Sequence, residues 1–84
     1  MRLVMVYREK SEARMSVETF IKDFKHRTGG EIETMDPDTR AGQNFIETYG
    51  IVEYPTLIAI GPGGTEMAKW RGMLPTISEA SAYK

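Results

Sequence analysis

The amino-acid sequence predicts a single α/β domain over residues 1–84, with its elements in the order β-α-β-α-β-β-α. Two unbroken apolar runs, at residues 3–7 and 55–60, are typical of strands that are buried on both faces. Two stretches between these runs repeat apolar residues at the spacing of an α-helix. A chain of 84 residues is long enough for one hydrophobic core and too short for two.

The first strand and the first helix are predicted from a change of period. Residues 3–7 (LVMVY) form the strand, and the charged segment that follows cannot continue it. Ser11 is then the expected N-cap of a helix, with Glu12 in its first turn, and Ser16 is an alternative start. Gly29 is expected to end the helix in a left-handed conformation. The buried stripe of this helix is Ala13, Val17, Phe20, Ile21 and Phe24.

The middle of the chain predicts a second strand and a second helix. Residues 31–35 alternate in polarity, which is typical of an outer strand with one solvated face. Asp36 and Pro37 are expected to be the N-cap and the first residue of the helix. Gly50 is expected to end it. The buried stripe of this helix is predicted to be Ala41, Phe45, Ile46 and Tyr49.

The last third of the chain predicts a hairpin and a short helix. The apolar run 55–60 (PTLIAI) and the alternating run 66–71 flank a Gly/Pro turn at residues 61–64. Thr76 and Glu79 form a capping-box pattern for a C-terminal helix. That helix is expected to dock through Ile77, Ala80 and Tyr83. A right-handed crossover and the hairpin together predict a four-stranded mixed sheet with helices on both faces. Its strand order is 31–35, 3–7, 55–60, 66–71.

Composition excludes several classes of function. The chain has no cysteine and one histidine, so disulfides and Cys/His zinc sites are excluded. A net charge of −1 gives no reason to expect nucleic acid as a partner. No apolar run spans a bilayer, and the first strand begins too close to Met1 for a signal peptide, so we expect a cytoplasmic protein. No metal or cofactor is expected, and the protein is expected to be a monomer or a weak homo-oligomer.

Charge is nevertheless unevenly distributed along the chain. Residues 1–27 carry seven Lys or Arg and four Asp or Glu, a local charge of +3. Residues 31–66 carry seven acids and one base, a local charge of −6. The distribution indicates either a dipolar surface that steers a charged partner or solvated faces with no such role.

Residues 49–57 (YGIVEYPTL) and 70–74 (WRGML) resemble the thioredoxin-like superfamily. The likeness extends over nearly the whole chain, although the N-terminal half matches mainly by its pattern of strands and helices. In that superfamily a cis proline precedes a central strand, and Pro55 is its counterpart. Gly72 corresponds to the glycine after the hairpin. The resemblance implies a compact thioredoxin fold in which the loop before Pro55 faces the start of the first helix.

The chain differs from active members of this superfamily in the residues that carry out redox chemistry. Active relatives carry a Cys-x-x-Cys motif at the first helix, where this chain has Ser11, Glu12, Ala13 and Arg14. They also keep a buried carboxylate near the end of the first strand, which is apolar here. A serine hydroxyl cannot form a disulfide, so dithiol oxidoreductase activity is excluded. We expect a redox-inactive, non-enzymatic member of the fold.

Three functions remain open from the sequence. The favoured hypothesis is a groove between residues 11–14 and Tyr54, Pro55 and Thr56 that binds an extended peptide or a protein partner. A second hypothesis is a glutathione-type ligand held at Ser11 and Pro55, although the acid-serine pair of glutathione transferases is missing from residues 72–75. A third is an assembly role through an outer strand or the C-terminal helix. Trp70 is either a partner contact or a side chain that covers the sheet.

Overall fold

The computed structural model describes residues 1–84 and contains one four-stranded sheet. The strand order is β2-β1-β3-β4, as predicted. Strands β1 and β2 are parallel, and the pairs β1–β3 and β3–β4 are antiparallel. The strands are β1 (Arg2–Val6), β2 (Glu33–Met35), β3 (Thr56–Ile60) and β4 (Glu66–Arg71).

The two apolar runs form the central strands because only they can lose water on both faces. All five residues of β3 are buried, as are the last four of β1. The outer strands are more exposed, and β2 has only three residues. The register pairs Val6 with Thr56, so the end of β1 lies beside the start of β3. This pairing brings the segments on either side of it, at residues 7–8 and 54–55, to the same end of the sheet.

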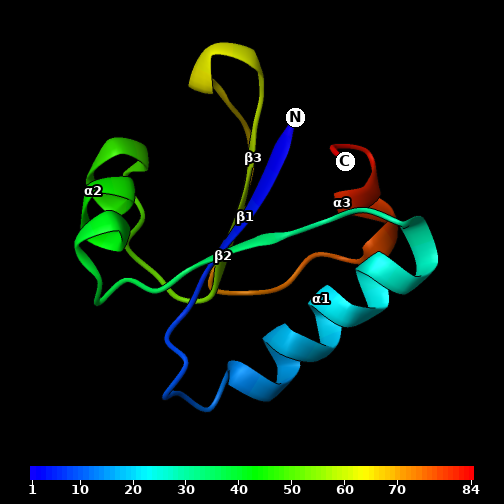
Figure 1. The fold of residues 1–84 in the computed structure, drawn as a ribbon, viewed down its shortest axis with the longest axis horizontal. Helices are drawn as coiled ribbons and strands as arrows, with labels where there is room; N and C mark the ends of the chain where they lie inside the picture. Colours follow the sequence, from blue (N-terminus) through cyan, green and yellow to red (C-terminus); the bar gives the residue numbers. More distant parts are fainter.

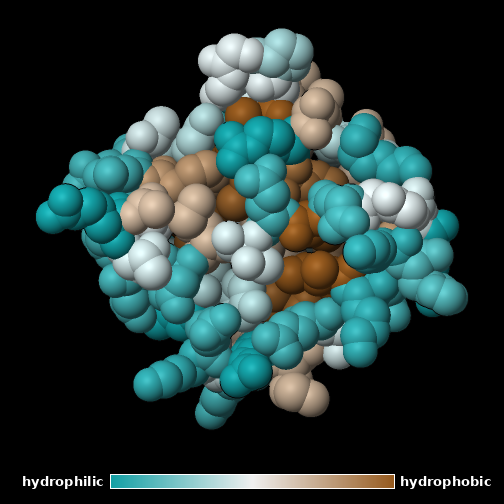
Figure 2. Space-filling view, in the orientation of Figure 1, coloured by the Kyte–Doolittle hydropathy of each residue, from teal (hydrophilic) through white to brown (hydrophobic).

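Helices cover both faces of the sheet, as predicted. Figure 1 shows α1 (Arg14–Thr28) and α3 (Ile77–Ser81) on one side and α2 (Arg40–Tyr49) on the other. On the α1 side Val17, Phe20 and Phe24 pack on the sheet, and the half-buried Ile77 and Tyr83 flank the buried Ala80. In Figure 2 polar side chains cover most of one face, with apolar atoms visible in its centre.

Helix α1 begins three residues after the predicted cap. The hydroxyl of Ser11 donates to the carbonyl of Arg8 (2.7 Å), and the N–H of Arg14 bonds to the carbonyl of Ser11 (3.2 Å). These bonds form a turn, and Ala13 takes the N-cap position without a side-chain cap. The prediction of Ser11 as the cap was therefore wrong, because its hydroxyl binds the preceding turn instead of the helix. Gly29 ends the helix in the left-handed conformation, as predicted.

Helix α2 also begins later than predicted. Thr39 is the N-cap, and its hydroxyl accepts from the N–H of Gly42 (2.9 Å). Asp36 instead accepts from the N–H of Asp38 (2.8 Å), which closes a local turn before the helix. The shift turns Ala41 outward and buries Gly42 in its place. The predicted residues Phe45, Ile46 and Tyr49 do pack on the sheet.

Helix α3 confirms the predicted capping box. The N–H of Glu79 donates to the hydroxyl of Thr76 (3.0 Å), and the N–H of Thr76 donates to the Glu79 carboxylate (2.9 Å). Trp70 is half-buried against the same core, with its ring 5.7 Å from that of Tyr83 in an edge-on arrangement. This packing gives Trp70 a structural role in attaching the last helix to the sheet.

An ion pair joins β1 to the short edge strand. Arg2 donates to both carboxylate oxygens of Glu33 at 2.8 and 2.9 Å. Hydrogen bonding to this carboxylate and its charge raise the pKa of Arg2, and the guanidinium lowers the pKa of Glu33 below its usual 4.5. Both side chains are about half exposed, so solvent screens the pair.

The ion pair predicts a pH-dependent contribution to stability. The pKa of Glu33 is lower in the folded chain than in the unfolded chain. The stability that the ion pair contributes is therefore complete above pH about 4.5, and it is lost as the pH falls through the pKa of Glu33 in the folded chain. Glu33→Gln should therefore lower the free energy of unfolding by less than about 1 kcal/mol at neutral pH, and the difference should vanish in acid. Urea unfolding across this pH range measures it, with Glu47→Gln, an exposed site without an ion pair, as the control. A difference that persists at low pH would contradict the assignment.

Candidate functional site

A groove opens at the end of the sheet where β1 ends and β3 begins. Its cavity has a volume of about 210 Å³. The register of β1 against β3 places the chain after one strand beside the loop before the other. The groove therefore unites segments that are more than 40 residues apart in the sequence. The lining residues are Tyr7, Arg8, Ser11, Ala13, Tyr54 and Pro55.

Two of the four predicted residues at the start of the first helix line this groove. Ser11 and Ala13 do so, although the Ser11 hydroxyl already donates to Arg8. Glu12 is exposed and lies outside the lining. Arg14 also lies outside it, because its Nε donates to Glu18 (3.1 Å) one helical turn away. The delayed start of α1 thus takes Glu12 and Arg14 out of the predicted site.

The loop before β3 forms the opposite wall. The Tyr54–Pro55 peptide bond is cis, and the carbonyl of Pro55 accepts from the N–H of Gly72 (2.9 Å). Thr56 was predicted to line the site, but it is buried and its hydroxyl donates to the carbonyl of Glu53 (2.6 Å). Neither the N–H nor the carbonyl of Tyr54 forms a hydrogen bond within the chain. The half-buried Tyr54 therefore carries one free backbone donor and one free acceptor beside the groove.

Arg8 is the one charged side chain among the lining residues, and the sequence interpretation missed it. Its guanidinium carbon lies 5.0 Å from the centre of the Tyr54 ring, within the range of a cation–π contact. Its Nε lies 3.3 Å from both carboxylate oxygens of Asp38. The available signal was its position directly after an apolar strand predicted to lie beside residues 55–60.

Tyr7 closes the inner end of the groove and was also not predicted as a site residue. The side chain is 6% exposed. Burial raises the pKa of its phenol, and the Glu18 and Glu9 carboxylates add to the shift. The phenol therefore stays neutral at neutral pH. The inner wall of the groove is accordingly uncharged, and Arg8 supplies the only formal charge of its lining.

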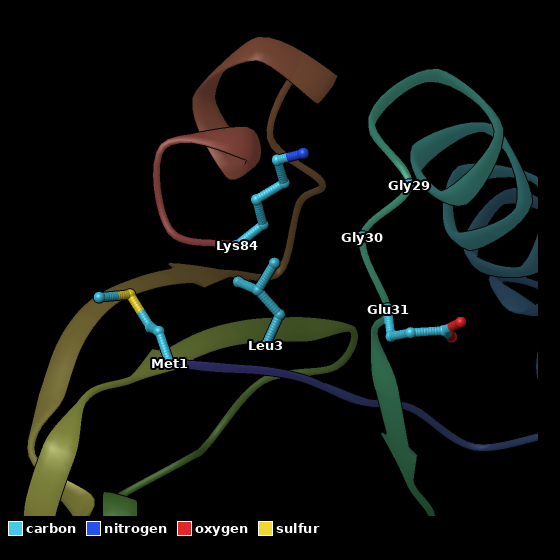
Figure 3. Close-up of a pocket in the computed structure, with 6 residues that line it drawn as sticks. All are labelled: Met1, Leu3, Gly29, Gly30, Glu31 and Lys84. Atoms are coloured by element: carbon cyan, nitrogen blue, oxygen red, sulfur yellow. The ribbon is translucent and has the colours of Figure 1, made fainter.

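A larger cavity, of about 400 Å³, lies at the other end of β1. Figure 3 shows the six residues that surround it, with the Lys84 side chain and the Glu31 carboxylate well apart. Lys84 donates to the carbonyl of Thr28, and Glu31 pairs with Lys25 (3.1 Å). Its polar side chains thus already have partners within the chain.

Two further findings concern other kinds of site. No group of three or more His, Cys, Asp or Glu side chains is arranged to hold a metal ion. No helix combines the length and the apolar character that crossing a bilayer requires.

The fold is similar to that of solved thioredoxins. Thioredoxin 1 of Thermosipho africanus superposes with a TM-score of 0.69 at 17% identity, over 99% of this chain and 89% of that protein. Thioredoxin O2 of Arabidopsis thaliana gives a TM-score of 0.72 at 16% identity, over 99% and 75% of the two chains. A malarial protein gives 0.67 at 14% identity, over 96% and 89%. No protein-family model and no curated protein sequence matches the chain. The strand order and these likenesses show that this cysteine-free chain has a thioredoxin-like fold.

Proposed function

We propose that the protein is a redox-inactive binding module that holds an extended segment of a partner protein in the groove beside Tyr54. The observation that carries this proposal is the pair of free backbone groups on Tyr54. An N–H and a carbonyl on one residue match the carbonyl and N–H of one residue in an extended peptide. Because Tyr54 is half-buried and lines the groove, both groups lie beside the cavity that the segment would enter.

The walls of the groove suit the side chains of such a segment. Ala13 and Pro55 contribute apolar surface from the two segments that line the groove, and the half-buried Tyr54 adds an aromatic ring. A volume of about 210 Å³ is below the usual range of about 300–1,000 Å³ for small-molecule pockets. A shallow groove of this size fits one or two peptide side chains, with the remaining affinity from backbone pairing. A single lining charge also favours a peptide over a nucleic-acid backbone.

Catalysis through a dithiol forms no part of this proposal, because the chain contains no cysteine. The hydroxyl of Ser11 lies at the groove but donates to the carbonyl of Arg8. If the Ser11 hydroxyl donated to a ligand instead, the carbonyl of Arg8 would lose this hydrogen bond. We therefore assign Ser11 to the turn that shapes the groove wall. The proposed activity is binding alone.

Selection from a library of random linear peptides tests the proposal. We expect selected peptides to shift the amide NMR signals of residues 7–14 and of Tyr54. Ala13→Arg, which places a long side chain in the groove, should weaken these peptides about tenfold or more, equivalent to about 1.4 kcal/mol. Met67→Ala on the outer strand is the matched control and should leave binding unchanged.

Two outcomes would contradict the proposal. One is that no peptide is selected above background. The other is that the selected peptides leave the Tyr54 signal in place and bind Ala13→Arg as well as the wild type. In either case binding in the groove would be excluded.

A further inference from the structure

We propose that this groove selects peptides with one acidic side chain, on the residue that pairs with Tyr54 or on its neighbour, and that Arg8 binds that carboxylate. The inference rests on the proposed peptide-binding function and adds to it the chemical class of the ligand. It follows from three features of Arg8: its unused donors, its orientation on the Tyr54 ring, and the weakness of its present ion pair.

Arg8 has hydrogen-bond donors that are not used within the chain. A guanidinium carries five N–H groups, one on Nε and four on the two terminal nitrogens. In the chain only the Nε group forms hydrogen bonds, both to Asp38. The terminal nitrogens therefore have no hydrogen-bond partner. They present the edge of the guanidinium that takes a carboxylate with two parallel bonds.

Tyr54 links the two recognition groups. The Arg8 guanidinium carbon lies 5.0 Å from the centre of the Tyr54 ring, while the backbone of the same residue carries the free N–H and carbonyl. Contact with the ring restricts the guanidinium, so less conformational entropy is lost when a ligand binds. A peptide residue that pairs with the Tyr54 backbone thus has its own side chain, or that of its neighbour, close to Arg8.

The present partner of Arg8 is exchangeable. Its distance to Asp38 of 3.3 Å is longer than the usual range for a charge-assisted hydrogen bond. The side chains are 48% and 65% exposed, and exposed pairs of this kind contribute little stability. A peptide carboxylate can therefore share the guanidinium with Asp38 at its free edge, or replace Asp38, at low cost.

Nearby acidic residues limit the preference to a single carboxylate. Glu9, Lys10 and Glu12 are exposed on the segment that forms one wall, and the exposed Glu53 precedes Tyr54 on the other. The three carboxylates outnumber the single ammonium of Lys10, so a second negative charge along the groove is repelled. We therefore expect selected peptides to carry one Asp or Glu in an otherwise uncharged or basic sequence, and polyacidic peptides to be excluded.

The test repeats the peptide selection with wild-type protein, Arg8→Gln and Arg8→Glu. The wild type should enrich Asp or Glu at one position, and replacing that residue by Gln or Asn in a selected peptide should weaken binding about tenfold. Arg8→Gln should lose the enrichment, and Arg8→Glu should replace it by Lys or Arg at the same position. Arg27→Gln, at the far end of α1, is the matched control and should select the same peptides as the wild type.

The outcomes separate this inference from the proposed function. Peptides that bind at Tyr54 without any acidic preference, or an acidic preference that survives in Arg8→Gln, would overturn the inference while peptide binding stands. Failure of the wild type to select any peptide would overturn both. Circular dichroism of each variant shows whether it is folded, and the Arg8→Glu reversal cannot arise from unfolding.

Discussion

Replacement of Phe24 by alanine is expected to lower the free energy of unfolding by about 3–5 kcal/mol. Phe24 is the largest fully buried side chain in the chain. It packs in the core between α1 and the sheet, with its ring 6.3 Å from that of Phe20. Its removal both loses buried apolar surface and leaves a cavity that the surrounding core can close only in part. Because single domains are stable by only about 5–15 kcal/mol, the loss is a large part of the total.

Urea unfolding followed by circular dichroism measures the effect of Phe24→Ala. Phe45→Ala is the matched control, since it deletes the same atoms from a half-buried ring on the opposite face of the sheet. We expect the control to cost clearly less, because part of the Phe45 ring already contacts water. Equal costs for the two variants would contradict the difference in burial between Phe24 and Phe45 on which this expectation rests.

Gly42→Ala is expected to have the second largest effect, about 1–3 kcal/mol or more. Gly42 is buried near the start of α2, where an added Cβ would overlap the carbonyl oxygen of Asp36 and lie 3.0 Å from the Cα of Pro37. Both obstacles are backbone atoms of the turn that leads into the helix. They cannot move without breaking the local bonds at Asp36 and Thr39. The usual gain from replacing a helical glycine by alanine is therefore reversed here.

The control for Gly42→Ala separates steric overlap from backbone conformation. Gly50 ends the same helix with φ of 62°, and an added Cβ there would meet no atom within 4 Å. Gly50→Ala should cost about 1–2 kcal/mol, from the left-handed conformation alone. If thermal and urea unfolding show Gly42→Ala to be milder than Gly50→Ala, the close approach of α2 to residues 36–37 is not as tight as described.

The strand order of the sheet was predictable because it depends on the polarity pattern of each strand, which can be seen in a few consecutive residues. The runs 3–7 and 55–60 are apolar without interruption, whereas 31–35 and 66–71 alternate. Only the first pair can be buried on both faces, so the order of all four strands followed. The capping box of Thr76 and Glu79 was predictable for a similar reason, since its two hydrogen bonds join residues three positions apart.

The starts of α1 and α2 were less predictable, because neighbouring polar residues compete for the same role. Ser11 and Asp36 are each good N-caps by residue type. In the structure each instead stabilises a turn before its helix, and the helices begin at Arg14 and Arg40. Whether such a side chain caps the helix or bonds to the preceding turn depends on how the helix packs on the sheet. That packing cannot be predicted from the neighbouring residues alone.

The same distinction applies to the candidate site. Sequence alone established that no dithiol can operate here, since that follows from the absence of cysteine. It also pointed to Ser11, Ala13, Tyr54 and Pro55, which the structure brings to one groove. Only the tertiary structure placed Arg8 over the Tyr54 ring, left the Tyr54 backbone unpaired, and removed Glu12, Arg14 and Thr56 from the lining. Composition and local pattern reveal which chemistry is absent and which strands are central. The side chains that meet at a groove are decided by strand register and helix position, which arise from contacts between distant parts of the chain.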